Sequence, residues 1–228
     1  MSILNPGSLA ETIDVINDVI FAGIKIPQSE KIELAKWLSS RQGIKGSYAG
    51  MPAPTEMDFK NPVKVFTGEK ITTAASKAHI LGEEACRAMI LIGVRNKEVK
   101  TALENATAGI LNRINESEIA CGKSGMYCCG ICTVSYWRHM TAGGLADTER
   151  RTEAGLKALK EHRLGDGRWR RFPYYYTLLA LEEIDHKLAI AEMKYAAPGL
   201  EHLLNRKPSK DKHINRRQVL AVKILSKC

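Results

Sequence analysis

The segment from Cys121 to His139 holds the densest set of metal-ligating and nucleophilic side chains in the chain. Four cysteines fall within twelve residues, and His139 follows the last of them. Thiolates and imidazole are ligands that zinc prefers in proteins. If residues 127–140 form a helix, Cys128 and Cys132 share one face and His139 lies one heptad further along it. We therefore predict a zinc site formed by Cys121, Cys128, Cys132 and His139.

Two other roles are open for these cysteines. Cysteine is a small apolar residue that fills contacts between closely packed helices. Cys129 and Cys132 also form a CxxC pair, in which a helix start would lower the pKa of a thiol and favour redox or nucleophilic chemistry. Because a second CxxC is absent from the sequence, packing, zinc binding and thiol chemistry all remain open at this point.

A second candidate site combines arginines and aromatic residues between Asp166 and Tyr176. Guanidinium groups and aromatic rings suit phosphate, diphosphate or stacked bases. We predict that this segment and the end of the cysteine segment together bind a ligand with an anionic group. The predicted ligand-binding residues are Tyr136, Trp137, His139, Asp166, Arg168, Trp169, Arg170, Arg171, Tyr174 and Tyr175. In the alternative interpretation, the aromatic side chains only join neighbouring helices and the arginines lie over them.

A glycine, one intervening residue and an aromatic recur three times between apolar helical stretches. The copies are Gly46-Ser47-Tyr48, Gly125-Met126-Tyr127 and Gly167-Arg168-Trp169. The last two copies are about 40 residues apart and the first two about twice as far, a spacing typical of helical-hairpin repeats. The glycine permits a tight turn after a helix, and the aromatic side chain packs back between hairpins.

These copies resemble the repeat of the prenyltransferase and squalene–hopene cyclase superfamily, which reads Gln-x-x-x-Gly-x-Trp. Gln42, Gly46 and Tyr48 match it with tyrosine in place of tryptophan, and the third copy matches its Gly-x-Trp end. The resemblance implies α/α helical hairpins in a partial or small toroid, whose concave face binds an apolar, isoprenoid-like ligand or a peptide. The Asp, Cys and His zinc ligands of the protein prenyltransferases and the Asp-rich motif of the cyclases have no clear counterpart, so neither activity is carried over.

Helical periodicity extends over most of the chain and predicts about nine helices. They cover residues 8–22, 27–41, 74–94, 97–115, 127–140, 148–162, 173–191, 198–204 and 215–226. Residues 43–73 contain three prolines and are predicted to form a long loop insertion, with a short extended piece at Val63–Phe66. Residues 205–215 are predicted to form a basic linker. We therefore assign residues 1–228 to one all-α, helical-repeat domain.

The charges of the chain bear on its partners. Lys and Arg number 34 against 25 Asp and Glu, and the net charge of +9 favours anionic partners. The basic cluster at 206–217 is interpreted as solvated surface, and so is Glu183, which is expected to pair with Lys187. The start of the chain lacks a signal-peptide pattern and no apolar run approaches membrane-spanning length, so we predict a cytoplasmic protein without a membrane span.

Three functions are open at this stage. The leading prediction is a protein that binds a small molecule or a peptide on the concave face of the helical array. The alternatives are an interaction module for nucleic acid or an acidic protein, and a zinc or thiol enzyme that uses the segment Cys121–His139. Because four hairpins are few for a closed toroid, a homodimer is one way to complete the array.

Overall fold

The computed structural model describes residues 3–122, 124–207 and 209–228, without the side chain of Cys121. In these ranges it has eleven α-helices, one short 3-10 helix and one two-stranded hairpin, so the predicted all-α class is confirmed. The helices are α1 (Leu9–Phe21), α2 (Gln28–Ser40), α3 (Glu56–Lys60), α4 (Ala74–Ile92), α5 (Lys97–Cys121), α6 (Gly130–Thr141), α7 (Thr148–Glu161), α8 (Tyr174–Glu183), α9 (Lys187–Ala196), α10 (Glu201–Leu204) and α11 (Lys212–Lys227). The strands β1 (Val63–Lys64) and β2 (Lys70–Ile71) pair antiparallel.

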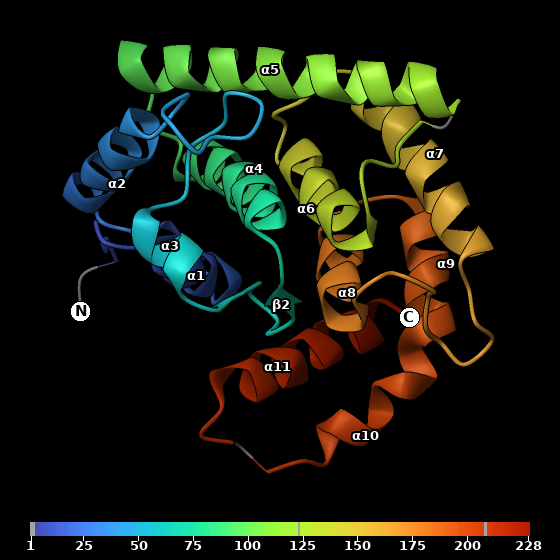
Figure 1. Ribbon diagram of the computed structural model, residues 1–228. Coiled ribbons are helices and arrows are strands. Elements are labelled where there is room, and N and C mark those ends of the chain that lie inside the picture. Colours follow the sequence, from blue (N-terminus) through green and yellow to red (C-terminus); the bar gives the residue numbers. More distant parts are fainter. Residues whose placement is uncertain (1–2, 123, 208) are drawn as a thin grey trace.

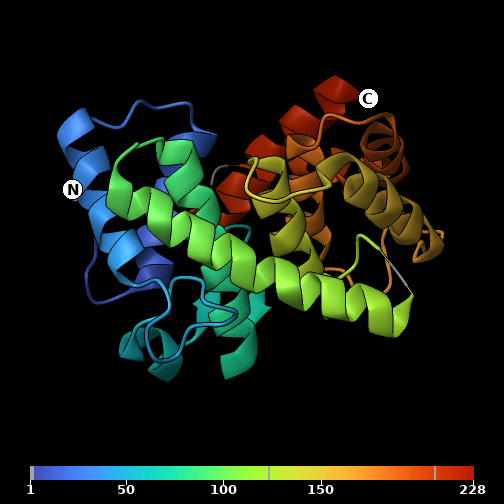
Figure 2. The same ribbon diagram turned by 90° about the horizontal axis from the view of Figure 1, so that it is seen from above.

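Helices α4 and α6 form the central pair of the molecule, and the other helices surround them (Figure 1). The long helix α5 lies across one end of the array, whereas α11 lies at the opposite end. When the molecule is seen from above, α5 crosses the other helices (Figure 2). Small and medium apolar side chains fill the centre, including Ala85 of α4, Val134 of α6 and Leu178 of α8, all fully buried. None of the helices in the described ranges is long and apolar enough to cross a membrane.

The predicted loop insertion at 43–73 contains more regular structure than expected. Helix α3 lies inside it and begins with a capping box, in which the side chains of Thr55 and Asp58 each accept a hydrogen bond from the backbone N–H of the other. The predicted extended piece is reduced to the two residues of β1. The predicted linker at 205–215 is also shorter, because α11 already begins at Lys212.

Two helix boundaries differ from the prediction in ways that affect the site. The helix predicted over 173–191 is divided into α8 and α9, because Ile184 is extended and the side chain of His186 caps α9 by accepting from the N–H of Leu188. The helix predicted from Tyr127 begins only at Gly130. The three residues before it therefore do not share the periodicity of α6.

A buried ionic network joins α4, α6 and α8. The guanidinium group of Arg138 donates two hydrogen bonds of 3.0 Å to the carboxylate of Glu183 and another to Glu84. Arg87 donates to Glu183 at 2.6 Å, and the hydroxyl of Tyr176 donates to Glu84 at 2.5 Å. Burial would raise the pKa of Glu183, but the charges of the two arginines outweigh it and hold the pKa below its ordinary value. Two arginines and two glutamates thus balance one another inside the helical core.

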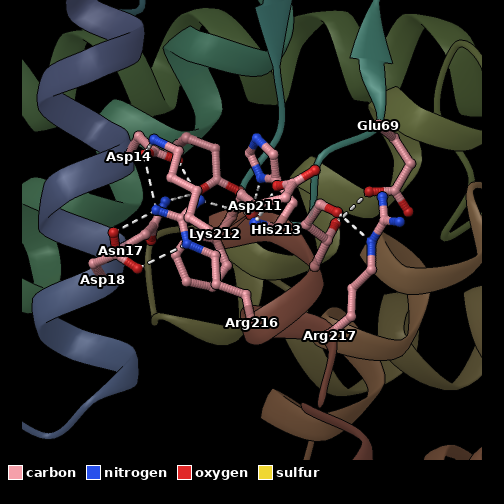
Figure 3. A network of polar contacts seen from close by, with 12 residues as sticks. Asp14, Asn17, Asp18, Glu69, Asp211, Lys212, His213, Arg216 and Arg217 are labelled. Carbon is pink, nitrogen blue, oxygen red and sulfur yellow. Dashed lines mark hydrogen bonds and ion pairs between the residues drawn. The ribbon is translucent and has the colours of Figure 1, made fainter. Parts of the chain in front are cut away.

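Figure 3 shows how α11 is fixed to α1 and to the chain beside the hairpin. Arg216 is 5% exposed and donates to both carboxylate oxygens of Asp14, at 2.7 and 2.8 Å, and to Asp18 at 2.8 Å. It also donates to the carbonyl oxygen of Phe66 at 2.9 Å. The interpretation of residues 206–217 as solvated surface is therefore wrong at Arg216, which anchors the last helix.

Replacing Arg216 by methionine is expected to lower the free energy of unfolding by about 2–3 kcal/mol, because Asp14 would lose its buried partner. Lys212 is the matched control, since it contacts the same carboxylate at 2.7 Å but its side chain is 61% exposed. Lys212→Met should cost at most about 1 kcal/mol. Urea unfolding followed by circular dichroism measures both values, and equal losses for the two variants would contradict the anchoring role of Arg216.

The same contact has a defined pH dependence. Burial would raise the pKa of Asp14, but hydrogen bonds from Arg216 and Lys212 outweigh it and lower the pKa. A carboxyl group with a lowered pKa stabilises the fold above its unfolded pKa of about 3.9, and this stability is lost as the pH falls through the folded value. The difference in stability between the wild type and Arg216→Met should therefore shrink below about pH 4.

Candidate functional site

The turn that leads into α6 is held in place by contacts to its neighbours. Gly125 has a φ of 75° and packs so closely on α7 that a Cβ atom there would lie 2.2 Å from the carbonyl oxygen of Arg151. The indole N–H of Trp137 donates to the carbonyl oxygen of Gly125 at 2.7 Å. The hydroxyl of Thr133 accepts from the N–H of Tyr127 at 3.1 Å and donates to its carbonyl oxygen at 2.9 Å. These contacts fix the residues that precede α6.

Cys128 follows this turn in the left-handed region, with a φ of 61°. Residues other than glycine seldom adopt this conformation, which costs about 1 kcal/mol or more. The conformation lets the chain turn from Tyr127 into α6, and the side chain of Cys128 is exposed. A conformation of this kind is frequent where a side chain must be directed at a site.

The next two cysteines lie on the first turn of α6 and differ in exposure. Cys129 is exposed and occupies the N-cap, whereas Cys132 is 1% exposed. The pKa of Cys129 is lowered to about 5, first by a hydrogen bond from the thiol of Cys132 and further by the backbone N–H of Cys132, the thiol of Cys128 and the backbone N–H of Ile131, against the effect of burial. The pKa of Cys132 is raised because its thiol donates that hydrogen bond and because the thiol is buried.

His79 of α4 completes this group of side chains. One of its ring nitrogens lies with the sulfur atoms of Cys128 and Cys132 in a cluster whose atoms are all within 4.8 Å of one another. The imidazole is 2% exposed and stacks on the ring of Tyr48, with 4.5 Å between the ring centres. Burial would lower the pKa of His79, but the neighbouring thiol of Cys128 and the carboxylate of Glu83 raise it to about 9.

Glu83 lies behind His79, one turn further along α4, and is fully buried. Its carboxylate is shared by two histidines: Oε1 lies 3.5 Å from Nε2 of His79, and Oε2 is hydrogen-bonded to Nδ1 of His139. Burial would raise the pKa of Glu83, but the charges of His139 and His79 and the hydrogen bond to His139 lower it to about 2. Glu83 is therefore an ionised group that orients the two imidazole rings.

The predicted zinc ligands are only partly brought together. Cys128 and Cys132 are neighbours, although Cys128 precedes α6 and the expectation that both lie on one helix face is wrong. His139 as a ligand is also wrong, because its Nδ1 is hydrogen-bonded to Glu83 and it does not join the group of His79, Cys128 and Cys132. The side chain of Cys121 lies outside the described part of the structure. His79 is absent from the predicted ligands; its i, i+4 spacing to Glu83 indicates a paired imidazole but does not point to the cysteines.

A cleft of about 880 Å³ opens beside the exposed thiols. Its lining combines the side chains of Cys128 and Cys129 with cationic and apolar side chains. Its other lining residues include Lys70, Arg171, Met126, Ile131 and Phe172. Pockets of this volume accommodate a small molecule or a short peptide segment, and mixed apolar and polar linings are typical of binding sites.

Four of the predicted ligand-binding residues do not line any free surface. Tyr136, Trp137 and His139 are at most 1% exposed, and Trp169 is 3% exposed. Trp169 donates its indole N–H to Glu192 at 2.8 Å. The prediction that these residues contact a ligand is therefore wrong, because their side chains pack between helices.

The other predicted ligand-binding residues include some that contact one another, such as Arg168 and Tyr174, but most of them lie away from the cleft. Asp166, Arg168, Arg170 and Arg171 are exposed, but of these only Arg171 lines the cleft at the cysteines. The two tyrosines are partly buried in structural contacts. The hydroxyl of Tyr174 donates to a backbone carbonyl of α9 at 3.0 Å, and the ring of Tyr175 lies 4.4 Å from the guanidinium group of Arg217 in α11.

A second hollow, of about 640 Å³, lies where α4 ends and α5 begins. Its lining is mainly apolar, with Ile90, Val94 and Leu103 among the contributing side chains. None of the described side chains predicted for a ligand or a metal lines it. The residues that could carry out chemistry therefore gather at the first cleft.

Comparison with protein-family models, with curated proteins and with solved structures finds no match for this chain. The function is accordingly inferred from the arrangement of the thiols, the imidazole and the cleft.

Proposed function

We propose that this protein is a thiol–disulfide oxidoreductase whose reactive pair is Cys129 and Cys132. The observation that carries the proposal is the position of Cys129, an exposed thiol at the N-cap of α6 and in the wall of the cleft. Cys132 lies behind it on the same helical turn and is buried. An accessible attacking thiol at a helix start and a protected second thiol three residues later are the two parts that disulfide exchange requires.

The helix itself supports the reaction. The partial positive charge at the start of a helix stabilises an anion placed there. Among the described residues no side-chain hydrogen bond caps α6, and the nearby backbone N–H groups of Cys132 and Ile131 help to lower the pKa of Cys129. The thiolate of Cys129 is therefore favoured by the helix start and exposed to the cleft.

The exchange proceeds in two steps. The thiolate of Cys129 attacks one sulfur of a substrate disulfide, the substrate S–S bond breaks, and the first thiolate leaves. Cys132 then loses its proton and attacks the sulfur of Cys129, which forms the internal disulfide and releases the second thiolate. The two cysteines are oxidised by two electrons, and the substrate disulfide is reduced to two thiols.

The proposal is tested with the reduced protein and a chromogenic aromatic disulfide. We expect a fast phase that releases about two thiolates per chain and leaves a Cys129–Cys132 disulfide, identified by peptide mass spectrometry. In Cys129→Ser the fast phase should disappear. In Cys132→Ser the reaction should stop after about one thiolate, with the probe bound to Cys129.

Cys228 and Cys86 provide matched controls. Cys228 is exposed and follows the last helix, whereas Cys86 is fully buried in α4. Cys228→Ser and Cys86→Ser should both keep the fast phase and its internal disulfide. A fast phase that survives in Cys129→Ser, or one that Cys228→Ser removes, would contradict the assignment.

A further inference from the structure

We propose that the reduced protein binds one zinc-type cation through His79, Cys128 and Cys132. This site goes beyond the proposed disulfide exchange, because it shares Cys132 with the reactive pair and adds His79 and Cys128 as ligands. Two thiolates and one imidazole form a donor set that selects zinc or cobalt over magnesium or calcium. The three donors come from α4, from the left-handed residue before α6 and from α6 itself.

The spacing of the donor atoms fits a tetrahedral site after a small adjustment. All three atoms lie within 4.8 Å of one another. Ligands on one tetrahedral zinc ion are about 3.5–3.8 Å apart, given bond lengths of about 2.0–2.3 Å. His79 and Cys132 are buried and held by their helices, whereas Cys128 is exposed. Rotation of the Cys128 side chain is therefore the movement that closes the site.

The side chains behind His79 are those that a metal-bound histidine requires. A ligating imidazole usually directs its second ring nitrogen at a carboxylate, which fixes the ring and increases its basicity. Glu83 provides this carboxylate, and His139 holds it from the other side. In the described part of the structure, the buried atoms Nε2 of His79 and Oε1 of Glu83 have no close hydrogen-bond partner and lie 3.5 Å from each other. A bound cation would draw this pair together.

One coordination position remains for a further ligand. Cys128 lines the cleft, whereas His79 and Cys132 lie behind it, so the open side of the cation would face the cleft. Three protein ligands with one free position distinguish zinc sites that bind a water molecule or a substrate from closed structural sites. The donor set also differs from the Asp, Cys and His set that the repeat resemblance would imply.

Metal binding is tested on fully reduced protein without a tag. After incubation with equimolar zinc and gel filtration, mass spectrometry should find about one zinc per chain. Cobalt should give absorption bands from thiolate-to-metal charge transfer. Competition with a chromogenic chelator gives the affinity, which should fall more than about 100-fold in Cys128→Ser, because a direct ligand matters more than its supporting carboxylate.

Two further variants make the result specific. His79→Gln should also lose the cation, and circular dichroism of the same sample shows whether it is folded. Cys129→Ser should bind zinc with an affinity close to that of the wild type, although it no longer exchanges disulfides. Zinc binding that Cys128→Ser leaves unchanged, or the absence of zinc from reduced wild-type protein, would overturn the site. Neither outcome bears on disulfide exchange, which is measured separately.

Discussion

Replacing Arg138 by methionine is expected to lower the free energy of unfolding by about 3–5 kcal/mol, which is the cost of removing one partner of a buried ion pair. Arg138 is 2% exposed and lies between the carboxylates of Glu84 and Glu183. Its loss would leave Arg87 as the one arginine bonded to this pair of glutamates, so one buried negative charge would remain without compensation. The measurement is urea unfolding at neutral pH, monitored by circular dichroism.

Arg113 is the matched control for this substitution. It also forms an ion pair, with Glu116 at 3.4 Å, but both side chains are more than half exposed. Arg113→Met should change the stability by no more than about 0.5 kcal/mol. The double variant Arg138→Met/Glu84→Gln should regain part of the loss, because it removes a buried charge as well. If Arg138→Met costs no more than Arg113→Met, the network does not stabilise the fold.

Replacing Gly130 by alanine is expected to have the second large effect, because Gly130 packs directly against the backbone of another segment that lines the cleft. A Cβ atom at this position would lie 2.0 Å from the carbonyl oxygen of Arg171, so the chain at Arg171 and Phe172 must move. We expect a loss of about 2–3 kcal/mol from overpacking. Because this chain forms a wall of the cleft, the buried thiol of Cys132 should also react faster with iodoacetamide.

Gly122 separates this clash from the general cost of adding a side chain to glycine. It has a φ of 62°, and apart from its chain neighbours none of the described residues has an atom within 4 Å of the position that a Cβ atom would occupy there. Gly122→Ala should therefore cost only the strain of a left-handed alanine, about 1 kcal/mol. Peptide mass spectrometry of alkylated samples measures the labelling of Cys132. Equal stability and equal labelling in the two variants would contradict the close packing at Gly130.

Local sequence patterns predicted the class of the fold but not its interior. The apolar periodicity of residues 8–22 and 97–115 predicted α1 and most of α5, since these helices bury one face. Glu183 was expected on a solvated face beside Lys187, and this prediction is wrong because α8 ends at Glu183, whose side chain turns inward to Arg87 and Arg138. The local sequence around a charged residue does not indicate a partner that lies far away in the chain.

The candidate site was found in the sequence for a reason that the structure corrects. Cys128 and Cys132 do meet, but through the left-handed turn at Cys128 and not through helical spacing. His79 could not be assigned to them, because only the packing of α4 on α6 brings it near. The resemblance to the prenyltransferase and squalene–hopene cyclase superfamily, with its toroid and its apolar ligand, stays a prediction.

Two polar side-chain contacts join α4 and α6 at neighbouring positions. Glu83 is hydrogen-bonded to His139. The next residue on α4, Glu84, is hydrogen-bonded to Arg138, which directly precedes His139 on α6. A single contact between two helices would leave them free to rotate about it, whereas two adjacent contacts restrict this rotation. The imidazole of His79 on α4 and the thiols at the start of α6 are therefore held in a fixed relative orientation by the two helices, with or without a ligand in the cleft.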